Sequence, residues 1–463
     1  MLRSPYGASR AADQIERDRE SGRPTLRDGQ LFLSLTAAWV AGGVILYLCV
    51  PLISPALLPL CLLAPVAWYV ATARRLPRSR PSTVTCALIL AGAYLAWNAS
   101  WSLSPSAAHL AIAMFFLFVL ATHLTTSTLA QNDADVLRAM GIGLYAGIVI
   151  GGVVLLIDAV SQQWIRRTLM SFLPGLRPKS RDMIVHADWV VFLEPYLINR
   201  NIAAVTLLFW PTSFLVSLLA MSARRQHWWL AGLIPAAAAI LAAKHATSKI
   251  AFVGAAITFA AFHVWPTATR RVIAWVWAGA IFLVVPLVTL AYHKQLYVWA
   301  WIPHSAQHRI VIWGYTSKQI ANAPILGAGI STARALNEER HNAPLAPASE
   351  FHLTTGAHSH NVYLQAWYET GAVGAALLLF IGLLVLRELA KAPQRAQPYL
   401  YAAFATCALL GGTSFGLWQP WFMASFGLVA AFAILGWALA DRMATQGDRR
   451  PQATGCARYS GRA

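Results

Sequence analysis

Stretches of about 20 apolar residues recur along the whole of this 463-residue chain. A helix of about that length crosses the hydrocarbon core of a bilayer. Charged residues make up only 12% of the chain, against about 25% in soluble proteins, which excludes a soluble enzyme and a disordered chain. We therefore predict an all-α, polytopic membrane protein with about twelve transmembrane helices, at residues 31–50, 52–73, 83–103, 107–126, 139–158, 201–221, 228–244, 249–265, 272–292, 361–386, 398–415 and 418–440.

The loops between these runs differ in charge. The short connections near 51, 104–106 and 416–417 hold no Lys or Arg, and the turn at 244–249, with Lys244 and Lys249, is a mild exception. Because cytoplasmic loops carry the excess of cations, both termini are predicted inside. This topology explains much of the net charge of +18, so no nucleic-acid partner is expected. The cations of the inner loops are Arg74, Arg75, Arg78, Arg80, Arg138, Arg224, Arg225, Arg270, Arg271, Arg387, Lys391 and Arg395.

The predicted organisation concentrates polar chemistry on the outer side. Two long outer loops, at 159–200 and 293–360, interrupt the spans, and seven of the 13 histidines lie between His293 and His360. Glu369 is the one carboxylate clearly inside a predicted span, whereas pumps and coupled transporters place several ionisable groups near the midplane. We therefore expect work at the outer membrane–water interface. The predicted parts are a cytoplasmic tail at 1–30, nine spans in 31–292, the large loop 293–360, three spans in 361–440 and a cytoplasmic tail at 441–463.

The most informative segment is HSHNVYLQAWYETGAVG at 358–374, where the large outer loop enters the tenth span. At 100° per residue, His360, Trp367, Gly371 and Gly374 are predicted to share one face of a helix, and the glycines would let a neighbouring helix approach closely. A histidine at the membrane surface can act as a general base, because its unperturbed pKa is near 6.5. The alternative is an interfacial histidine that caps the helix beside Asn361.

Two arginines occupy comparable outer positions. Arg200 begins the sixth span, where a helix N-terminus already favours anions, and its guanidinium could clamp a phosphate or reach lipid headgroups. Arg309 begins a predicted amphipathic helix at 309–322, with Trp313 four residues on and Pro324 ending it. Arg309 could be a second phosphate contact, although its residues alone favour a role in holding this helix on the membrane surface. No HExxH, DxD or zinc spacing accompanies the other loop histidines, which are interpreted as solvated or structural, so no metal or cofactor is predicted.

Together these segments resemble the O-antigen ligase / O-antigen polymerase family of bacterial envelope glycosyltransferases. The resemblance rests on the run around Arg200, on the run from Arg309 through Trp313 to Gly327, and on His360-Asn361 followed by Gly371 and Gly374. These features occur in the family's order, and the resemblance is clear over residues 195–375. It implies a GT-C-like enzyme of the bacterial inner membrane, with a periplasmic active site and an undecaprenyl-diphosphate-linked glycan as donor.

The resemblance also implies residue roles. His360 would be the base, Arg200 and Arg309 would bind the diphosphate, and transfer would be metal-independent with inversion at the anomeric carbon. Asn361, Trp313, Trp367, Gly371 and Gly374 would support them. The leading hypothesis is an O-antigen ligase that joins the polysaccharide to lipid A–core oligosaccharide during lipopolysaccharide assembly. Alternatives are a polymerase or a protein O-oligosaccharyltransferase of the same family, or a lipid-linked glycan transporter, which the nearly charge-free spans disfavour.

Overall fold

The computed structural model of the protein describes residues 26–73, 80–220, 223–336 and 342–448. The predicted tails at 1–30 and 441–463, and the inner loop at 74–82, lie partly outside these ranges. Helices account for nearly all of the regular structure, and the prediction of an all-α polytopic membrane protein is confirmed.

The first half of the chain forms a set of long helices and one small hairpin. Its elements are α2 (Leu26–Cys49), η1 (Pro51–Ile53), α3 (Ser54–Ala73), α4 (Thr83–Asn98), η2 (Ala99–Trp101), α5 (Pro105–Gln131), α6 (Ala134–Val160), α7 (Trp164–Phe172), η3 (Pro174–Leu176), η4 (Ser180–Asp182), β1 (Met183–His186), β2 (Trp189–Leu193), η5 (Pro195–Ile198) and α8 (Asn199–Leu219). The second half comprises α9 (Ala223–Ala231), α10 (Ile234–Ala242), α11 (Ala246–Val264), α12 (Pro266–His293), η6 (Leu296–Val298), α13 (His304–Ile320), α14 (Thr332–Leu336), α15 (Val362–Leu389), α16 (Gln397–Thr413) and α17 (Pro420–Asp448).

Nine helices in the described ranges are long and apolar enough to cross a membrane: α2, α4 with η2, α5, α6, α8 with η5, α11, α12, α15 and α17. The other predicted spans are also helical, as η1 with α3, as α9 and α10, and as the 17-residue α16. The prediction of one continuous helix at 228–244 is wrong. A side chain at Gly232 would overlap the hydroxyl of Tyr145, and Pro235, which has no backbone N–H, lies in the first turn of α10.

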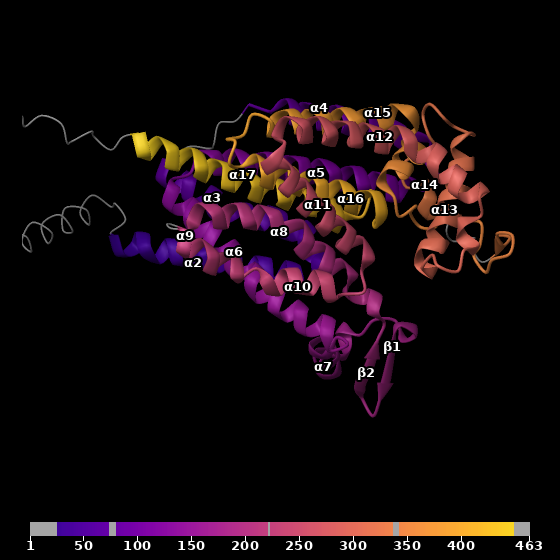
Figure 1. Ribbon diagram of the computed structural model, residues 1–463, viewed down its shortest axis with the longest axis horizontal. Coiled ribbons are helices and arrows are strands. Elements are labelled where there is room, and N and C mark those ends of the chain that lie inside the picture. The colour runs from indigo at the N-terminus through magenta and orange to yellow at the C-terminus, as the bar shows by residue number, and fades with distance from the viewer. Residues whose placement is uncertain (1–25, 74–79, 221–222, 337–341, 449–463) are drawn as a thin grey trace, which may run out of the picture.

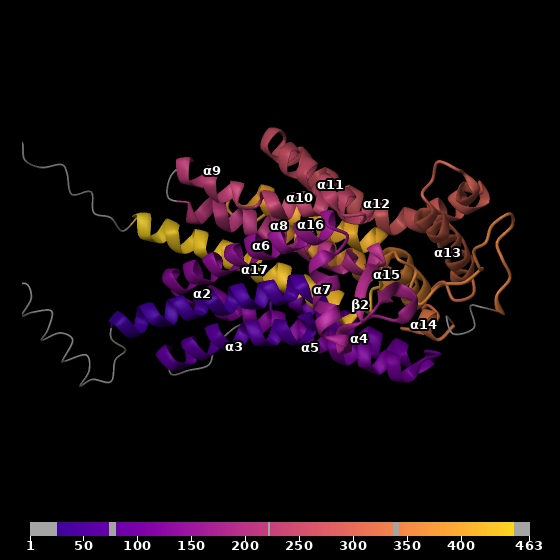
Figure 2. The ribbon, with the colours of Figure 1, turned by 90° about the horizontal axis from the view of Figure 1, so that it is seen from below.

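Helix α8 lies in the middle of the bundle, between α2, α6, α16 and α17 (Figures 1 and 2). Its residues from Ile202 to Leu208 are all fully buried. A helix that is apolar on every face is one that other helices enclose, so α8 has little freedom to shift. This fixes Arg200, in its first turn, relative to the rest of the bundle.

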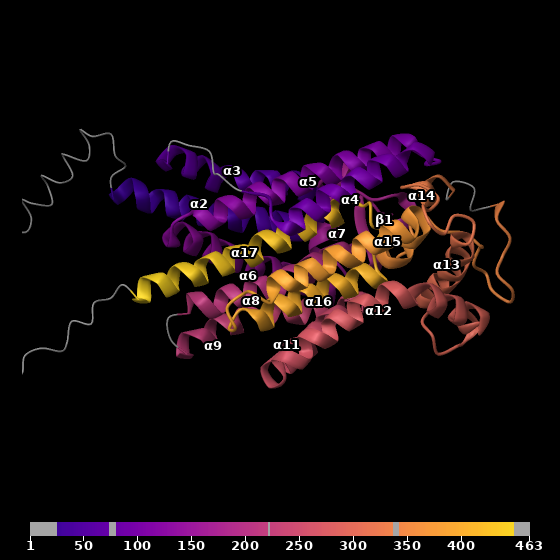
Figure 3. The same cartoon turned by 90° about the horizontal axis from the view of Figure 1, so that it is seen from above.

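The two predicted outer loops lie toward one end of the bundle, opposite the end where α2 begins and α17 finishes (Figures 1 and 3). The loop at 159–200 contains α7 and an antiparallel hairpin of β1 and β2, which the sequence analysis did not predict. Ala187 and Asp188, the two turn residues, both have positive φ, as the tight turns that match strand twist require. The described part of the loop at 293–360 contains η6, α13 and α14.

Helix α15 is broken at Gly371, where φ is +62° and ψ is −165°. Residues 324–329, here called the crossing segment, pass this break. The N–H groups of Ala328 and Gly329 donate to the carbonyls of Tyr368 and Glu369, each at 2.9 Å, and the N–H groups of Ala372 and Val373 donate back to the segment at 2.9 and 3.2 Å. The crossing segment therefore satisfies backbone groups that the break leaves without helical partners.

Two sequence-based expectations for this helix are wrong. His360 precedes the first helical residue and Gly371 is not helical, so they cannot share one continuous helical face. A side chain at Gly371 would overlap the carbonyl of Ile325, and one at Gly374 would overlap Thr370 of the same helix. Gly371 therefore admits the crossing segment, whereas neither glycine admits a neighbouring helix.

Replacing Gly371 by alanine should destabilise the protein. Residues other than glycine avoid this backbone conformation at a cost of about 1–3 kcal/mol, and the overlap with Ile325 adds to that cost. Thermal unfolding in detergent should show a lower midpoint for Gly371→Ala. Gly42→Ala in α2 is the matched control, since nothing lies within 4 Å of the added carbon. Equal midpoints for the two variants would contradict the described break.

Candidate active site

The segment before α15 is held in a defined conformation. The side chain of Asn361 caps the helix by accepting from the N–H of Leu364 at 3.0 Å. Trp313 of α13 donates its indole N–H to the carbonyl of Ser359 at 2.7 Å. Between them, His360 has a φ of +55°, in the left-handed region that costs a non-glycine residue about 1–2 kcal/mol. Asn361, and not His360, is therefore the capping residue, which leaves the imidazole for other contacts.

The imidazole of His360 points to the connection between α16 and α17. Its Nδ1 lies 2.8 Å from the carbonyl oxygen of Ser414. A carbonyl can only accept, so Nδ1 carries the proton and Nε2 of the neutral ring holds the free electron pair. Burial, together with the positive charge of Arg309, lowers the pKa of His360 to about 4, and the bond to Ser414 acts in the opposite direction. The ring is therefore neutral at pH 7, with Nε2 able to accept a proton.

Arg309, in the first half of α13, reaches the same connection. Its Nη1 donates to the carbonyl of Thr413 at 2.8 Å and to the hydroxyl of Thr247 at 3.4 Å. Burial lowers the pKa of the guanidinium from its usual value. A guanidinium has five N–H donors, so these contacts leave others for a ligand. Arg309 thus joins α13 to the same connection that holds His360, a contact beyond the surface-anchoring role that the sequence alone favoured.

Arg200 lies in the first turn of α8, and its position depends on its neighbour Asn201. The buried amide of Asn201 donates to the carbonyls of Leu48 and Cys49 at 2.6 and 2.7 Å, which ties α8 to the end of α2. The side chain of Arg200 is exposed, and it makes no hydrogen bond or ion pair with the described residues. It is therefore a positive charge that a ligand can approach.

His358 shows that these groups lie close together. Its ring is 4.2 Å from that of His360, centroid to centroid, and its Nε2 is 3.3 Å from the side-chain nitrogen of Gln419. Burial, the His360 ring and the positive charges of Arg200 and Arg309 lower the pKa of His358 to about 3. The structure thus brings the three sequence-predicted residues to one place.

Sequence reasoning did not find several residues of this site. His358 had been interpreted as solvated or structural, although its spacing of two from His360 was a usable signal. Thr413 and Ser414 supply their carbonyls, which any residue type could do, so no sequence signal marks them. His245 directly precedes α11 and Thr247 lies in its first turn, within a stretch that the sequence marked only by its two lysines.

Glu369 and Trp367 support the site from α15. The buried carboxylate of Glu369 accepts from the N–H groups of Ser331 and Ala333, at 3.2 and 3.1 Å, and from the indole of Trp418. The carboxylate of Glu369 thus satisfies backbone N–H groups at the start of α14. Trp367 donates to the carbonyl of Ile281 at 2.8 Å and so fastens α15 to α12.

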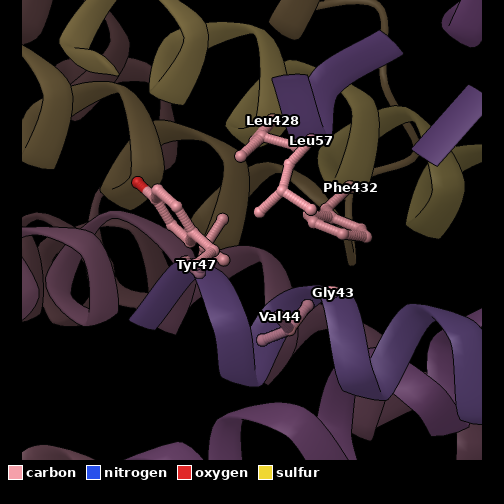
Figure 4. A pocket seen from close by; sticks show the side chains of 7 residues that line it. Gly43, Val44, Tyr47, Leu57, Leu428 and Phe432 are labelled. Carbon is pink, nitrogen blue, oxygen red and sulfur yellow. The ribbon is translucent and has the colours of Figure 1, made fainter. Parts of the chain in front are cut away.

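Elsewhere in the described ranges, fewer side chains could bind a ligand or take part in a reaction. No group of three His, Cys, Asp or Glu side chains there has a metal-binding arrangement. A small apolar pocket lies among α2, α3, α8 and α17 (Figure 4). Its one polar group, the hydroxyl of Tyr47, donates to Ser425 at 2.7 Å. The residues lining it are Gly43, Val44, Tyr47, Leu57, Leu208, Leu428 and Phe432.

The fold and the site thus define a helical membrane protein in which two arginines and two neutral histidines gather at one end of the bundle. Comparison with known proteins then indicates a particular family of membrane proteins. Residues 230–379 match the family model described as O-antigen ligase, which confirms the resemblance for the stretch containing Arg309, Trp313 and His360. Arg200 lies outside the matched stretch.

Individual relatives agree with this family. A protein named "Putative polysaccharide ligase RP358" from Rickettsia prowazekii is 30% identical over 122 residues, and one with a similar name from Rickettsia conorii is 27% identical over 133 residues. Each alignment covers 26% of this chain, and it covers 30% and 29% of the two relatives respectively. The chain therefore aligns with less than a third of the length of these curated relatives.

Proposed function

We propose that the protein is an O-antigen ligase of the bacterial inner membrane, with its active site on the periplasmic side. It transfers a polysaccharide from undecaprenyl diphosphate to the lipid A–core oligosaccharide. The observation that carries this proposal is the His360–Ser414 hydrogen bond, which leaves Nε2 of His360 unprotonated; Arg309 acts on this ring, and Arg200 and Arg309 act on the neighbouring His358. A base next to paired cations suits the attack of a hydroxyl on a sugar whose leaving group is a diphosphate.

In the proposed reaction, Nε2 of His360 takes the proton of an acceptor hydroxyl. The hydroxyl oxygen attacks the anomeric carbon from the side opposite the diphosphate, which inverts the configuration there. The bond from this carbon to the diphosphate oxygen breaks, and the leaving group carries away the electron pair. Arg200 and Arg309 bind that developing negative charge through guanidinium N–H groups. Two guanidiniums supply the charge compensation that a metal ion gives in other transferases, so no cofactor is required.

Reconstitution is the decisive test of the proposed function. Purified protein in liposomes would receive a labelled undecaprenyl-diphosphate polysaccharide and lipopolysaccharide that lacks this polysaccharide, with His360→Ala as the inactive control. We expect label on the lipid A–core, both with and without EDTA. Longer donor chains would indicate a polymerase, label on protein an oligosaccharyltransferase, and movement of donor without a covalent product a transporter. A requirement for a restored divalent metal would contradict the role given to the two arginines.

Substitutions should separate the base from the cations. His360→Ala should lower the ligation rate by about 10²–10⁴-fold with little change in donor affinity. Arg200→Ala should weaken donor binding without disturbing the fold, since the described residues give this side chain no hydrogen bond. Arg309→Ala should weaken donor binding and also lower the ligation rate, because the carbonyl of Thr413 loses its hydrogen-bond donor. Lysine at either position should rescue only partly, since it lacks the planar fork of arginine.

Ligation rate and donor affinity would be measured for each of these variants. The matched control is Arg181→Ala, an exposed outer-loop arginine whose partner is the adjacent Asp182. Wild-type ligation by His360→Ala would show that the base is misassigned.

The low pKa of His360 predicts an unusual pH profile. The base must be unprotonated, and its pKa in the free site is about 4, so kcat/KM should be constant at neutral pH and fall only as the pH drops through about 4. A bound diphosphate adds negative charge, which favours the imidazolium and raises the pKa. The acid limb of kcat should therefore lie at higher pH than that of kcat/KM. A kcat/KM limb near the ordinary histidine value of about 6.5 would contradict the described site.

A further inference from the structure

His245, in the turn between α10 and α11, is a buried histidine that the proposed reaction does not use. Its side chain is only 4% exposed. Its Nδ1 lies 2.7 Å from the hydroxyl of Ser248, and its Nε2 lies 3.1 Å from the hydroxyl of Ser414. Both ring nitrogens are thus bonded to hydroxyl groups inside the protein, and one of these belongs to the residue whose carbonyl accepts from His360.

The contacts of His245 are not those of an ordinary helix cap. His245 occupies the N-cap position of α11, yet its side chain makes no capping hydrogen bond to that helix. The ring instead spans from α11 to a residue 169 positions along the chain, where it also lies against Phe415, 5.9 Å between ring centroids. Burying a polar ring costs free energy unless both of its nitrogens are hydrogen-bonded. The buried ring of His245 therefore holds the hydroxyl of Ser414 in a fixed position.

We infer that His245 is a positioning residue for the glycosyl-transfer reaction, acting through Ser414 on His360. The His245–Ser414 side-chain bond holds the peptide whose carbonyl selects the tautomer of His360 and aims Nε2 at the acceptor. This inference rests on the proposed function. His245 itself does not touch the substrate.

The surroundings of His245 keep it neutral in this role. The nearby charged group that acts on the ring is Arg309, and burial together with this positive charge lowers the pKa of His245 to about 3. A neutral imidazole donates through one nitrogen and accepts through the other, and a serine hydroxyl can do either. The chain Ser248–His245–Ser414 is therefore satisfied without adding a third cation to the site.

Three variants test the inference in the same reconstituted ligation assay. His245→Phe keeps a ring of similar size and removes both hydrogen bonds. Ser414→Ala removes only the hydroxyl, while its backbone carbonyl still faces His360. His245→Gln restores a group with a donor and an acceptor. His263→Phe is the matched control, since His263 is exposed at the other end of α11 and, among the described residues, bonds to Phe259 four residues earlier.

We expect His245→Phe and Ser414→Ala to lower kcat by similar factors, about 10–100-fold, as when groups that orient a catalytic ligand are removed. The KM for the lipid-linked donor should change little, because Arg200 and Arg309 remain. The double variant should be no worse than either single one, since both remove the same link. His245→Gln should recover part of kcat, and His263→Phe should match the wild type.

The outcomes separate this inference from the proposed function. If the wild type ligates and His360→Ala does not, but Ser414→Ala keeps full kcat, the positioning role is wrong and the proposed function stands. If the wild type transfers no glycan, the proposed function fails first. Should His245→Phe not fold, as judged by its elution and thermal unfolding, Ser414→Ala decides alone, since it removes a single oxygen atom.

Discussion

The candidate site depends on two neighbouring backbone carbonyls between α16 and α17. The carbonyl of Thr413 accepts from Arg309 and that of Ser414 accepts from His360, each at 2.8 Å. A carbonyl oxygen can only accept a hydrogen bond. The carbonyl of Thr413 therefore holds the guanidinium of Arg309 in place, and the carbonyl of Ser414 keeps the proton of His360 on Nδ1. The same connection is held from α15, where Gln365 accepts from the N–H of Leu417 at 2.9 Å. The backbone between α16 and α17 thereby determines which nitrogen of His360, just before α15, is protonated.

The electrostatics of the site are one-sided. The charges that act on His245, His358 and His360 come from Arg200, Arg309 and other imidazoles, and all of them favour the neutral ring. Glu369, the buried carboxylate of α15, accepts hydrogen bonds from backbone N–H groups and an indole. This charge distribution is what the proposed diphosphate donor requires, because the donor would supply the missing negative charge.

The sequence predicted the helices better than their interruptions. Apolar runs set by bilayer thickness located every span, whereas the divided run at 228–244 and the break at Gly371 depend on Tyr145 and on Ile325, which are remote in sequence. For the site, charge and placement at helix ends made Arg200, Arg309 and His360 candidates, and only the family resemblance gave them roles, which stay predictions. Ser414 and His245 were not predictable, because one contributes a carbonyl and the other acts through a hydroxyl.

The position of those two carbonyls has a consequence for biosynthesis. During synthesis, Arg200, Arg309 and His360 all emerge before residue 413, and domains form as the chain is made. A nascent chain that ends before α16 is complete would carry all three side chains, but Arg309 and His360 would lack the carbonyls of Thr413 and Ser414. For the proposed ligase, catalytic competence would then arrive late, with α16 and α17, and an incompletely made protein would meet the proposed lipid-linked donor without being able to react with it.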